Sequence, residues 1–198
     1  VWDLICYALS LFGLAIRVMT VGFVPRDTSG RNTSGQVAVR LNTSGMYSLM
    51  RHPLYFGNFW MWFGASLFPR VWWSPVLVSV FFLVVYERIM FAEERFLSEK
   101  FGDQYLEWSS RTSAFWPRLK TWRPPEYPFS LRAVLRRENS SLLAVTTVFF
   151  VLEVVSTVVV ERHFELDPVW TAIFGIALGV YAALKVLKKL KLLNEPGR

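Results

Sequence analysis

Five long apolar runs dominate this sequence and constrain its fold more than any other feature. They cover about residues 4–24, 54–69, 71–91, 142–160 and 168–187. A helix needs about 20 mostly apolar residues to cross the hydrocarbon core of a bilayer. The run at 54–69 is short, and Phe68-Pro69-Arg70 separates it from the next one. We predict an all-α, polytopic transmembrane bundle of about five spans, in which the second and third runs form a tight helical hairpin.

The basic residues alternate between the loops in the way that sets membrane orientation. The four loops and the C-terminal tail carry, in chain order, 4, 1, 10, 1 and 5 Lys and Arg residues. Such residues concentrate on the cytoplasmic side of a membrane. We therefore expect loops 25–52 and 87–141 and the C-terminus to be cytoplasmic. Since this pattern accounts for most of the net charge of +7, we expect no nucleic-acid partner.

The composition excludes several other classes of protein. Hydrophobic residues make up 53% of the chain and charged residues 19%, which is unlike a disordered protein. Cys6 is the only cysteine, and His52 and His163 are the only histidines, so we expect neither a disulfide within the chain nor a metal site. The chain opens in apolar sequence without an initiator Met, and we expect a native segment to precede Val1.

A cluster of polar, aromatic and glycine residues lies directly before the second apolar run. It reads Gly45-Met46-Tyr47-Ser48-Leu49-Met50-Arg51-His52-Pro53-Leu54-Tyr55-Phe56-Gly57. Pro53 suits the first turn of a helix, whose free N–H groups favour an anionic group. Gly45 and Gly57 would let a ligand or a neighbouring backbone come close. The alternative is an interfacial anchor, in which the Arg-His pair reaches headgroups and the tyrosines join an aromatic belt.

A second charged cluster continues the third run beyond the membrane. Glu93 and Glu94 are adjacent, so they point about 100° apart on a helix and at least one of them can face the bundle. Carboxylates there suit a cationic or hydroxyl-rich ligand. Aromatic residues at helical spacing follow and predict the apolar stripe of an interfacial helix at about 93–110. The alternative is a solvated helix end that carries Glu/Arg pairs.

Taken together, the two clusters resemble a known family. The pattern is Gly45-x-Tyr47-x3-Arg51-His52-Pro53-x-Tyr55-x-Gly57, then Glu93-Glu94-x2-Leu97-x3-Phe101-Gly102-x2-Tyr105. It resembles the isoprenylcysteine carboxyl methyltransferase family, which is grouped with the phosphatidylethanolamine N-methyltransferases. The stretch 111–117 resembles the basic-aromatic-Pro ending of that family. We therefore divide the chain into a membrane methyltransferase core at 1–125 and a C-terminal extension at 126–198, which holds the last two runs.

The resemblance implies S-adenosylmethionine as methyl donor, bound in a pocket at the cytoplasmic face. The residues that it assigns to this pocket are Gly45, Tyr47, His52, Pro53, Tyr55, Gly57, Glu93 and Glu94. Carboxylates suit the sulfonium, amine and ribose of the donor, and Arg51 suits its carboxylate. The resemblance also implies a lipid or lipidated acceptor in the membrane. We expect Arg51, Arg111 and Glu94 to be the catalytic residues.

Protonation chemistry narrows the choice of acceptor. Carboxylate and phosphate oxygens are nucleophilic at neutral pH, whereas a headgroup amine first loses a proton to a positioned base. With few histidines present we favour an oxyanion, held by Arg51 and Arg111 through bidentate contacts, although Glu93 or Glu94 would serve as base for an amine. The candidates are a prenylated cysteine carboxylate, a lipid phosphate such as that of lipid A, and phosphatidylethanolamine.

Two other functions stay open at this point. Sterol reductases share an Arg-His-Pro-x-Tyr-x-Gly stretch and bind NADPH. They tend to have a Cys and a Lys-Tyr-Gly sequence where this chain has Glu93-Glu94 and Lys100-Phe101-Gly102. The other alternative is a non-catalytic membrane protein that binds lipid. The sequence indicates neither the oligomeric state, nor the role of the last two runs, nor which of the two glutamates contacts the donor.

Overall fold

The computed structural model describes residues 1–25, 38–160 and 162–195. Within these residues the chain is helical and forms no β-strand. The long helices are α1 (Trp2–Gly22), α3 (Pro53–Leu67), α4 (Trp73–Phe101), α7 (Asn139–Val159) and α8 (Pro168–Lys189). The short ones are α2 (Met46–Leu49), α5 (Asp103–Arg111), the 3₁₀ helix η1 (Leu119–Thr121) and α6 (Leu131–Arg137). The prediction of an all-α bundle is confirmed.

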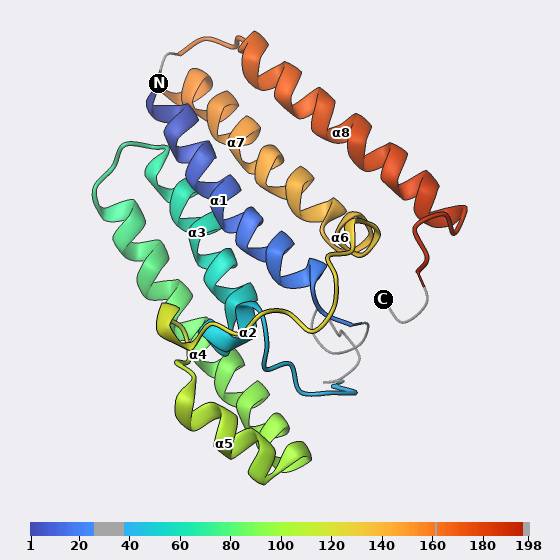
Figure 1. Cartoon of the computed structure of the whole chain (residues 1–198). Helices are drawn as coiled ribbons and strands as arrows, with labels where there is room; N and C mark the ends of the chain where they lie inside the picture. Colours follow the sequence, from blue (N-terminus) through green and yellow to red (C-terminus); the bar gives the residue numbers. More distant parts are fainter. Residues whose placement is uncertain (26–37, 161, 196–198) are drawn as a thin grey trace.

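The long helices lie side by side in the order α8, α7, α1, α3 and α4 (Figure 1). Among the described residues, four helices are long and apolar enough to cross a membrane, namely α1, α4, α7 and α8. The remaining one, α3, has 15 residues. At about 1.5 Å per residue it is about 22 Å long, less than a hydrocarbon core of about 30 Å. The predicted run at 54–69 is therefore a helix, but one shorter than a bilayer.

The start of α3 and the boundary between α4 and α5 follow from proline and glycine. Pro53 is the first residue of α3, and Arg70, with φ of +58°, lies in the turn before α4. α4 continues beyond the predicted limit of 71–91 to Phe101. Gly102, with φ of +50°, ends α4 and begins α5, a conformation that glycine adopts readily. The interfacial helix predicted at 93–110 is therefore divided between α4 and α5.

Small residues bring α1 and α3 close together. A methyl group on Gly13 would collide with the carbonyl oxygen of Gly57, and one on Gly64 would collide with Ser10. The Ser10 hydroxyl donates to the carbonyl oxygen of Met61 at 2.8 Å. Close contacts of this kind are typical of helix pairs in membranes. Gly57, which the resemblance assigns to the donor pocket, thus serves helix packing in this structure.

The C-terminal helices pack on the same bundle through aromatic side chains. Phe149 of α7 is fully buried, and its ring centroid lies 5.2 Å from that of Tyr7 in α1 and 5.6 Å from that of Phe68. The ring of Trp170 in α8 stacks on that of Phe149 with a centroid distance of 5.7 Å. The hydroxyl groups of Tyr7 and Thr146 are 3.0 Å apart. The extension is therefore in direct contact with the core helices.

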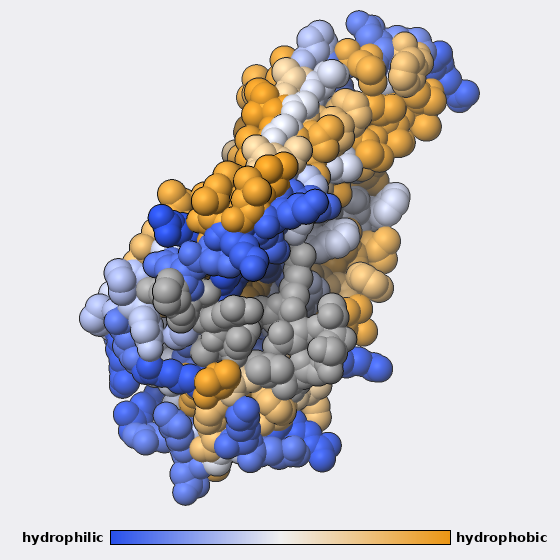
Figure 2. All heavy atoms as spheres, turned by 90° about the vertical axis from the view of Figure 1, so that its right-hand side faces the viewer, coloured by the Kyte–Doolittle hydropathy of each residue, from blue (hydrophilic) through white to orange (hydrophobic). Residues whose placement is uncertain are grey.

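The surface separates into apolar and polar parts. In Figure 2 apolar residues cover most of the upper part of the molecule, and hydrophilic residues gather over the lower part. Exposed apolar residues of α7 and α8 include Val151, Val155 and Ile176. Such side chains suit contact with hydrocarbon, whereas the polar part suits an aqueous interface.

Candidate functional site

The segment before α3 is held by a second segment about sixty residues further along the chain. The backbone N–H groups of Arg51 and His52 donate to the carbonyl oxygens of Ser113 and Ala114 at 2.8 and 3.1 Å. The Arg118 N–H donates to the carbonyl oxygen of Leu49 at 3.0 Å. The stretch predicted as the end of the family motif therefore lies beside the Arg-His-Pro sequence and fixes its backbone.

Arg51 is held on two sides by α4 and α5. Its Nε and Nη2 donate to the two carboxylate oxygens of Glu94 at 2.9 and 3.1 Å. Its Nη1 donates to the carbonyl oxygens of Ser109 and Thr112 at 2.9 and 3.1 Å. These contacts use four of the five N–H donors of the guanidinium group. Arg51 thus joins three elements and is largely committed to protein contacts.

His52 is buried between the two glutamates of α4. Its Nε2 lies 2.8 Å from Glu94 Oε1, and its Nδ1 lies 3.6 Å from Glu93 Oε2. The Tyr55 hydroxyl donates to Glu93 Oε2 at 2.8 Å, and its ring stacks on the imidazole with a centroid distance of 5.4 Å. Burial of the ring opposes its protonation, but the hydrogen bonds that the ring donates to Glu93 and Glu94, and the negative charges of these carboxylates, outweigh this and raise the pKa of His52. The site therefore favours an imidazolium flanked by carboxylates.

Tyr105 of α5 lies near Glu94 and Arg51. Its side chain is 4% exposed. Burial, and then the negative charge of the nearby Glu94, raise the pKa of its hydroxyl, so this group stays protonated in the physiological range.

A small pocket opens beside this cluster. We call it the histidine pocket; its volume is about 150 Å³ and its lining is Arg17, Tyr47, Arg51, His52, Pro53, Leu54, Tyr55, Asn58 and Glu93. Six of these residues belong to the motif that the sequence singles out. Glu93 lines the pocket directly, whereas Glu94 is occupied with Arg51 and His52. The two adjacent carboxylates therefore have different surroundings.

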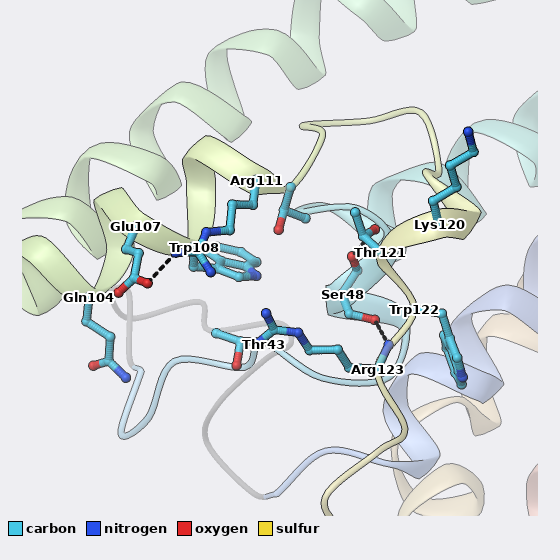
Figure 3. Close-up of a pocket in the computed structure, with 11 residues that line it drawn as sticks. Thr43, Ser48, Gln104, Glu107, Trp108, Arg111, Lys120, Thr121, Trp122 and Arg123 are labelled. Carbon is cyan, nitrogen blue, oxygen red and sulfur yellow. Dashed lines mark hydrogen bonds and ion pairs between the residues drawn. The ribbon is translucent and has the colours of Figure 1, made fainter.

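Arg111 lies away from this cluster and lines a second pocket of about 400 Å³. Its Nη2 donates to Glu107 Oε1 at 2.6 Å within α5. Figure 3 shows it near Trp108, with Lys120 contributed by η1 and Arg123 by the loop after η1. The structure thus brings together Arg51 and Glu94 of the predicted catalytic set, and it places Arg111 elsewhere.

Gly45, which the resemblance assigns to the donor pocket, determines the local backbone conformation near this second pocket. Its φ is +58°, a value that favours glycine, and its N–H donates to the carbonyl oxygen of Arg123 at 3.0 Å. The carbonyl oxygen of Tyr47 accepts a hydrogen bond from Trp108 Nε1 at 3.2 Å. Gly45 thus shapes the turn before α2, and the Tyr47 side chain reaches the histidine pocket.

The sequence does not predict a polar network that reaches the histidine pocket, where Arg17 and Asn58 form part of the lining. Arg17 of α1 pairs with Glu138 through two hydrogen bonds of 2.9 and 2.7 Å, and both side chains are almost completely buried. Its Nη1 also donates to Asn58 Oδ1 at 2.7 Å, and Asn58 Nδ2 donates to the Tyr86 hydroxyl at 3.0 Å. A lone arginine within an apolar run was the available signal, since buried charges in membranes need partners.

Comparison with known proteins gives a family match for the N-terminal half of this chain. The model of the phospholipid methyltransferase family matches residues 4–104, about half of the chain. The chain belongs to this family. The match covers α1 to α4 and both motif clusters up to Gly102, and it ends before α6, α7 and α8. It confirms the resemblance found in the sequence, and together with the four apolar helices it identifies an integral membrane protein.

Curated relatives include two bacterial resistance proteins and a plant enzyme. The cobalt-zinc-cadmium resistance protein CzcN of Cupriavidus metallidurans is 34% identical over 115 residues, 58% of this chain and 51% of the relative. The nickel-cobalt-cadmium resistance protein NccN of Alcaligenes xylosoxydans xylosoxydans is 29% identical over 122 residues, 62% and 57% of the two chains. Protein-S-isoprenylcysteine O-methyltransferase B of Arabidopsis thaliana is 33% identical over 117 residues, 52% and 56%. The chain spans about half the length of these relatives, and no solved structure matches.

Proposed function

We propose that this chain is a methyltransferase that transfers a methyl group from S-adenosylmethionine to the polar group of a lipid or lipidated acceptor. Membership of the family and the likeness to a plant isoprenylcysteine methyltransferase support this function. The observation that carries it is the buried His52 between Glu93 and Glu94, beside a pocket at the end of the α3–α4 hairpin. An interfacial anchor would leave these side chains in contact with headgroups and would not pair them with one another.

The donor set of the histidine pocket fits S-adenosylmethionine. Glu93 and the Tyr55 hydroxyl would hold its cationic and hydroxyl groups, and Tyr47 also lines the pocket. The volume of about 150 Å³ is below the roughly 300–1,000 Å³ of sites that enclose a whole ligand. We therefore assign this pocket to the reacting end of the donor. When bound, the donor supplies a methyl group on a sulfonium, and transfer forms a bond from the acceptor to carbon while the C–S pair returns to sulfur.

We assign different tasks to the two glutamates. Glu93 faces the pocket and would contact the donor. Glu94 pairs with Arg51 and His52 and would act as a positioning residue that keeps both side chains in place. Alignment of the reactants and exclusion of water would be the main contributions of the protein to the rate.

The orientation that we propose places the histidine pocket at the cytoplasmic face. The support is the distribution of Lys and Arg, which concentrate in the loops at this end of the hairpin. S-adenosylmethionine would then reach the pocket from the cytoplasm, while the acceptor would arrive from the bilayer.

Thermal stabilisation by added ligands tests this function against a reductase. S-adenosylhomocysteine should raise the melting temperature of the purified protein, because a ligand that binds the native state stabilises it, and NADPH should not. His52→Ala should abolish the shift. His163→Ala, which changes the exposed second histidine, should keep it. A shift with NADPH alone would overturn the proposal.

A further inference from the structure

A third pocket lies between α3, α4 and α7, and its volume is about 420 Å³. We call it the α7 pocket. Tyr55, Asn58 and Tyr86 line one end, and the rest is mostly apolar, with Met61 and Ala65 further along α3. From Tyr55 to Ala65 it follows α3 for ten residues, about 15 Å along the helix axis. An elongated, largely apolar pocket beside membrane-spanning helices suits a hydrocarbon chain better than a polar ligand.

The α7 pocket shares two lining residues with the proposed site. Tyr55 and Asn58 line both it and the histidine pocket. A molecule whose chain lies in the α7 pocket would therefore present its polar group at these two residues. Glu93, which we assign to the donor, hydrogen-bonds to Tyr55 on the other side of this boundary.

The wall formed by α7 comes from outside the part of the chain that matches the family. Ala144 and Val148 of this helix line the pocket. Several contacts fix the wall in place: Glu138 pairs with Arg17 before the helix begins, and Phe149 packs among aromatic rings of α1 and α8. The pocket is thus built by well-anchored helices.

The polar end of the pocket has a directed hydrogen-bond chain. Arg17 donates to the amide oxygen of Asn58, so the amide nitrogen of Asn58 is left to donate to the Tyr86 oxygen. The Tyr86 oxygen accepts this hydrogen bond, and its own proton is then free to point into the pocket. Arg17 lies at the start of this chain and sets its direction. Such a hydroxyl can donate to an oxygen acceptor in the pocket.

We propose that the α7 pocket binds the hydrocarbon chain of the acceptor, and that Tyr86 donates a hydrogen bond to the acceptor's oxygen. This inference rests on the proposed methyl transfer and names its substrate class, a lipid that carries a carboxylate or phosphate. The C-terminal extension then determines which chains fit, because Ala144 and Val148 set the width of the pocket. Arg17 and Asn58 are positioning residues for Tyr86.

A pair of bulky substitutions on one face of α7 tests the pocket. Ala144→Phe should fill it and raise the acceptor KM at least tenfold, with the thermal shift from S-adenosylhomocysteine unchanged. Val155→Phe adds a ring on the same exposed face, about 16 Å further along the helix and outside the pocket, and should leave KM unaltered. Equal KM values for both variants would overturn the inference. Val148→Phe repeats the test if Ala144→Phe fails to fold.

The acceptor atom is tested with three lipid probes: a prenylated cysteine, phosphatidic acid and phosphatidylethanolamine. The labelled methyl group should appear on the prenylated cysteine or on the phosphatidic acid. Tyr86→Phe should raise the KM for the probe that is methylated. Tyr181→Phe, on α8, is the control and should leave that KM unchanged. Methylation of the amine alone would contradict the proposed acceptor class. Failure of the wild-type protein to bind S-adenosylhomocysteine or to methylate any probe would instead reject the proposed function.

Binding of the chain has a readout that does not depend on activity. A phosphatidic acid with a photoreactive diazirine in its acyl chain should crosslink to the segment that contains Ala144 and Val148, and Ala144→Phe should remove this crosslink. Crosslinks confined to the outer face of α8, or unchanged in Ala144→Phe, would show that the pocket holds no lipid chain.

Discussion

Two arginine–glutamate ion pairs each join separate segments of this molecule, and the two pairs differ in their exposure to solvent. Arg17 and Glu138 join α1 to the extension, with side chains 7% and 5% exposed. Arg51 and Glu94 join the segment before α3 to α4, with side chains 19% and 27% exposed, and they adjoin a pocket. Both pairs are bidentate. The same type of ion pair thus anchors a helix in one place and, in the function that we propose, would position the residues of the site in the other.

The largest effect is expected when the buried pair loses one partner. Glu138→Ala leaves the Arg17 guanidinium buried without its counter-charge, and this should lower the free energy of unfolding by about 3–5 kcal/mol. Unfolding in mixed detergent, followed by circular dichroism, measures the change. Replacing both Arg17 and Glu138 with Met should recover most of the loss, since no buried charge is then left unpaired. Equal losses in the single and double variants would show that the pair is not the anchor.

The site pair should affect binding more than folding. Glu94→Gln removes the charge that holds Arg51 and His52, and we expect the affinity for S-adenosylhomocysteine to fall by roughly 10–100-fold, about 1.4–2.7 kcal/mol. Isothermal titration calorimetry measures this affinity. Glu99→Gln, on the same helix, is the matched control and should bind as the wild type does. Wild-type affinity in Glu94→Gln would refute the positioning role.

The pH dependence of stability should report the protonation of His52. Its raised pKa means that the folded state holds the proton more tightly than the unfolded state does. The resulting stabilisation is fully present below the ordinary value of 6.5 and is lost as the pH rises through the raised pKa of the native state. The melting temperature of the wild type should therefore exceed that of His52→Gln most at low pH. A gap that widens above neutral pH would contradict this assignment.

The smallest effect is expected at an exposed pair of the same type. Arg95 Nε lies 2.9 Å from Glu99 Oε1 within α4, and the two side chains are 72% and 66% exposed. Exposed pairs at this spacing contribute only about 0.3–0.5 kcal/mol. Arg95→Ala should therefore change the free energy of unfolding by no more than this amount. A loss as large as that in Glu138→Ala would remove the distinction between buried and exposed pairs.

The sequence predicts those parts of the site whose residues are neighbours in the chain or follow the order of the family motif. The Arg51-His52-Pro53 stretch and the Glu93-Glu94 pair do come together, as the family motif implies. The five apolar runs became helices, because long apolar segments have few other stable forms in a membrane. The division between α4 and α5 was missed, since Gly102 alone marks it.

The remaining features depend on contacts between distant parts of the chain. Glu138 lies 121 residues from Arg17, and no local pattern pairs them. Arg111 has the charge of an anion ligand, but it lies on α5 beside Glu107, away from Arg51. The α7 pocket exists only because α7 lies against α3 and lines the pocket together with α4, and the sequence of α7 alone is typical of an ordinary span.

Transfer of a labelled methyl group is the most direct test of the account. Purified protein in lipid nanodiscs is incubated with methyl-labelled S-adenosylmethionine and a lipid extract, and the lipids are separated and identified by mass spectrometry. We predict one labelled lipid class, formed by the wild type and by Glu99→Gln and lost in Glu93→Ala. Absence of label from every lipid, in protein that S-adenosylhomocysteine fails to stabilise, would contradict the proposed function.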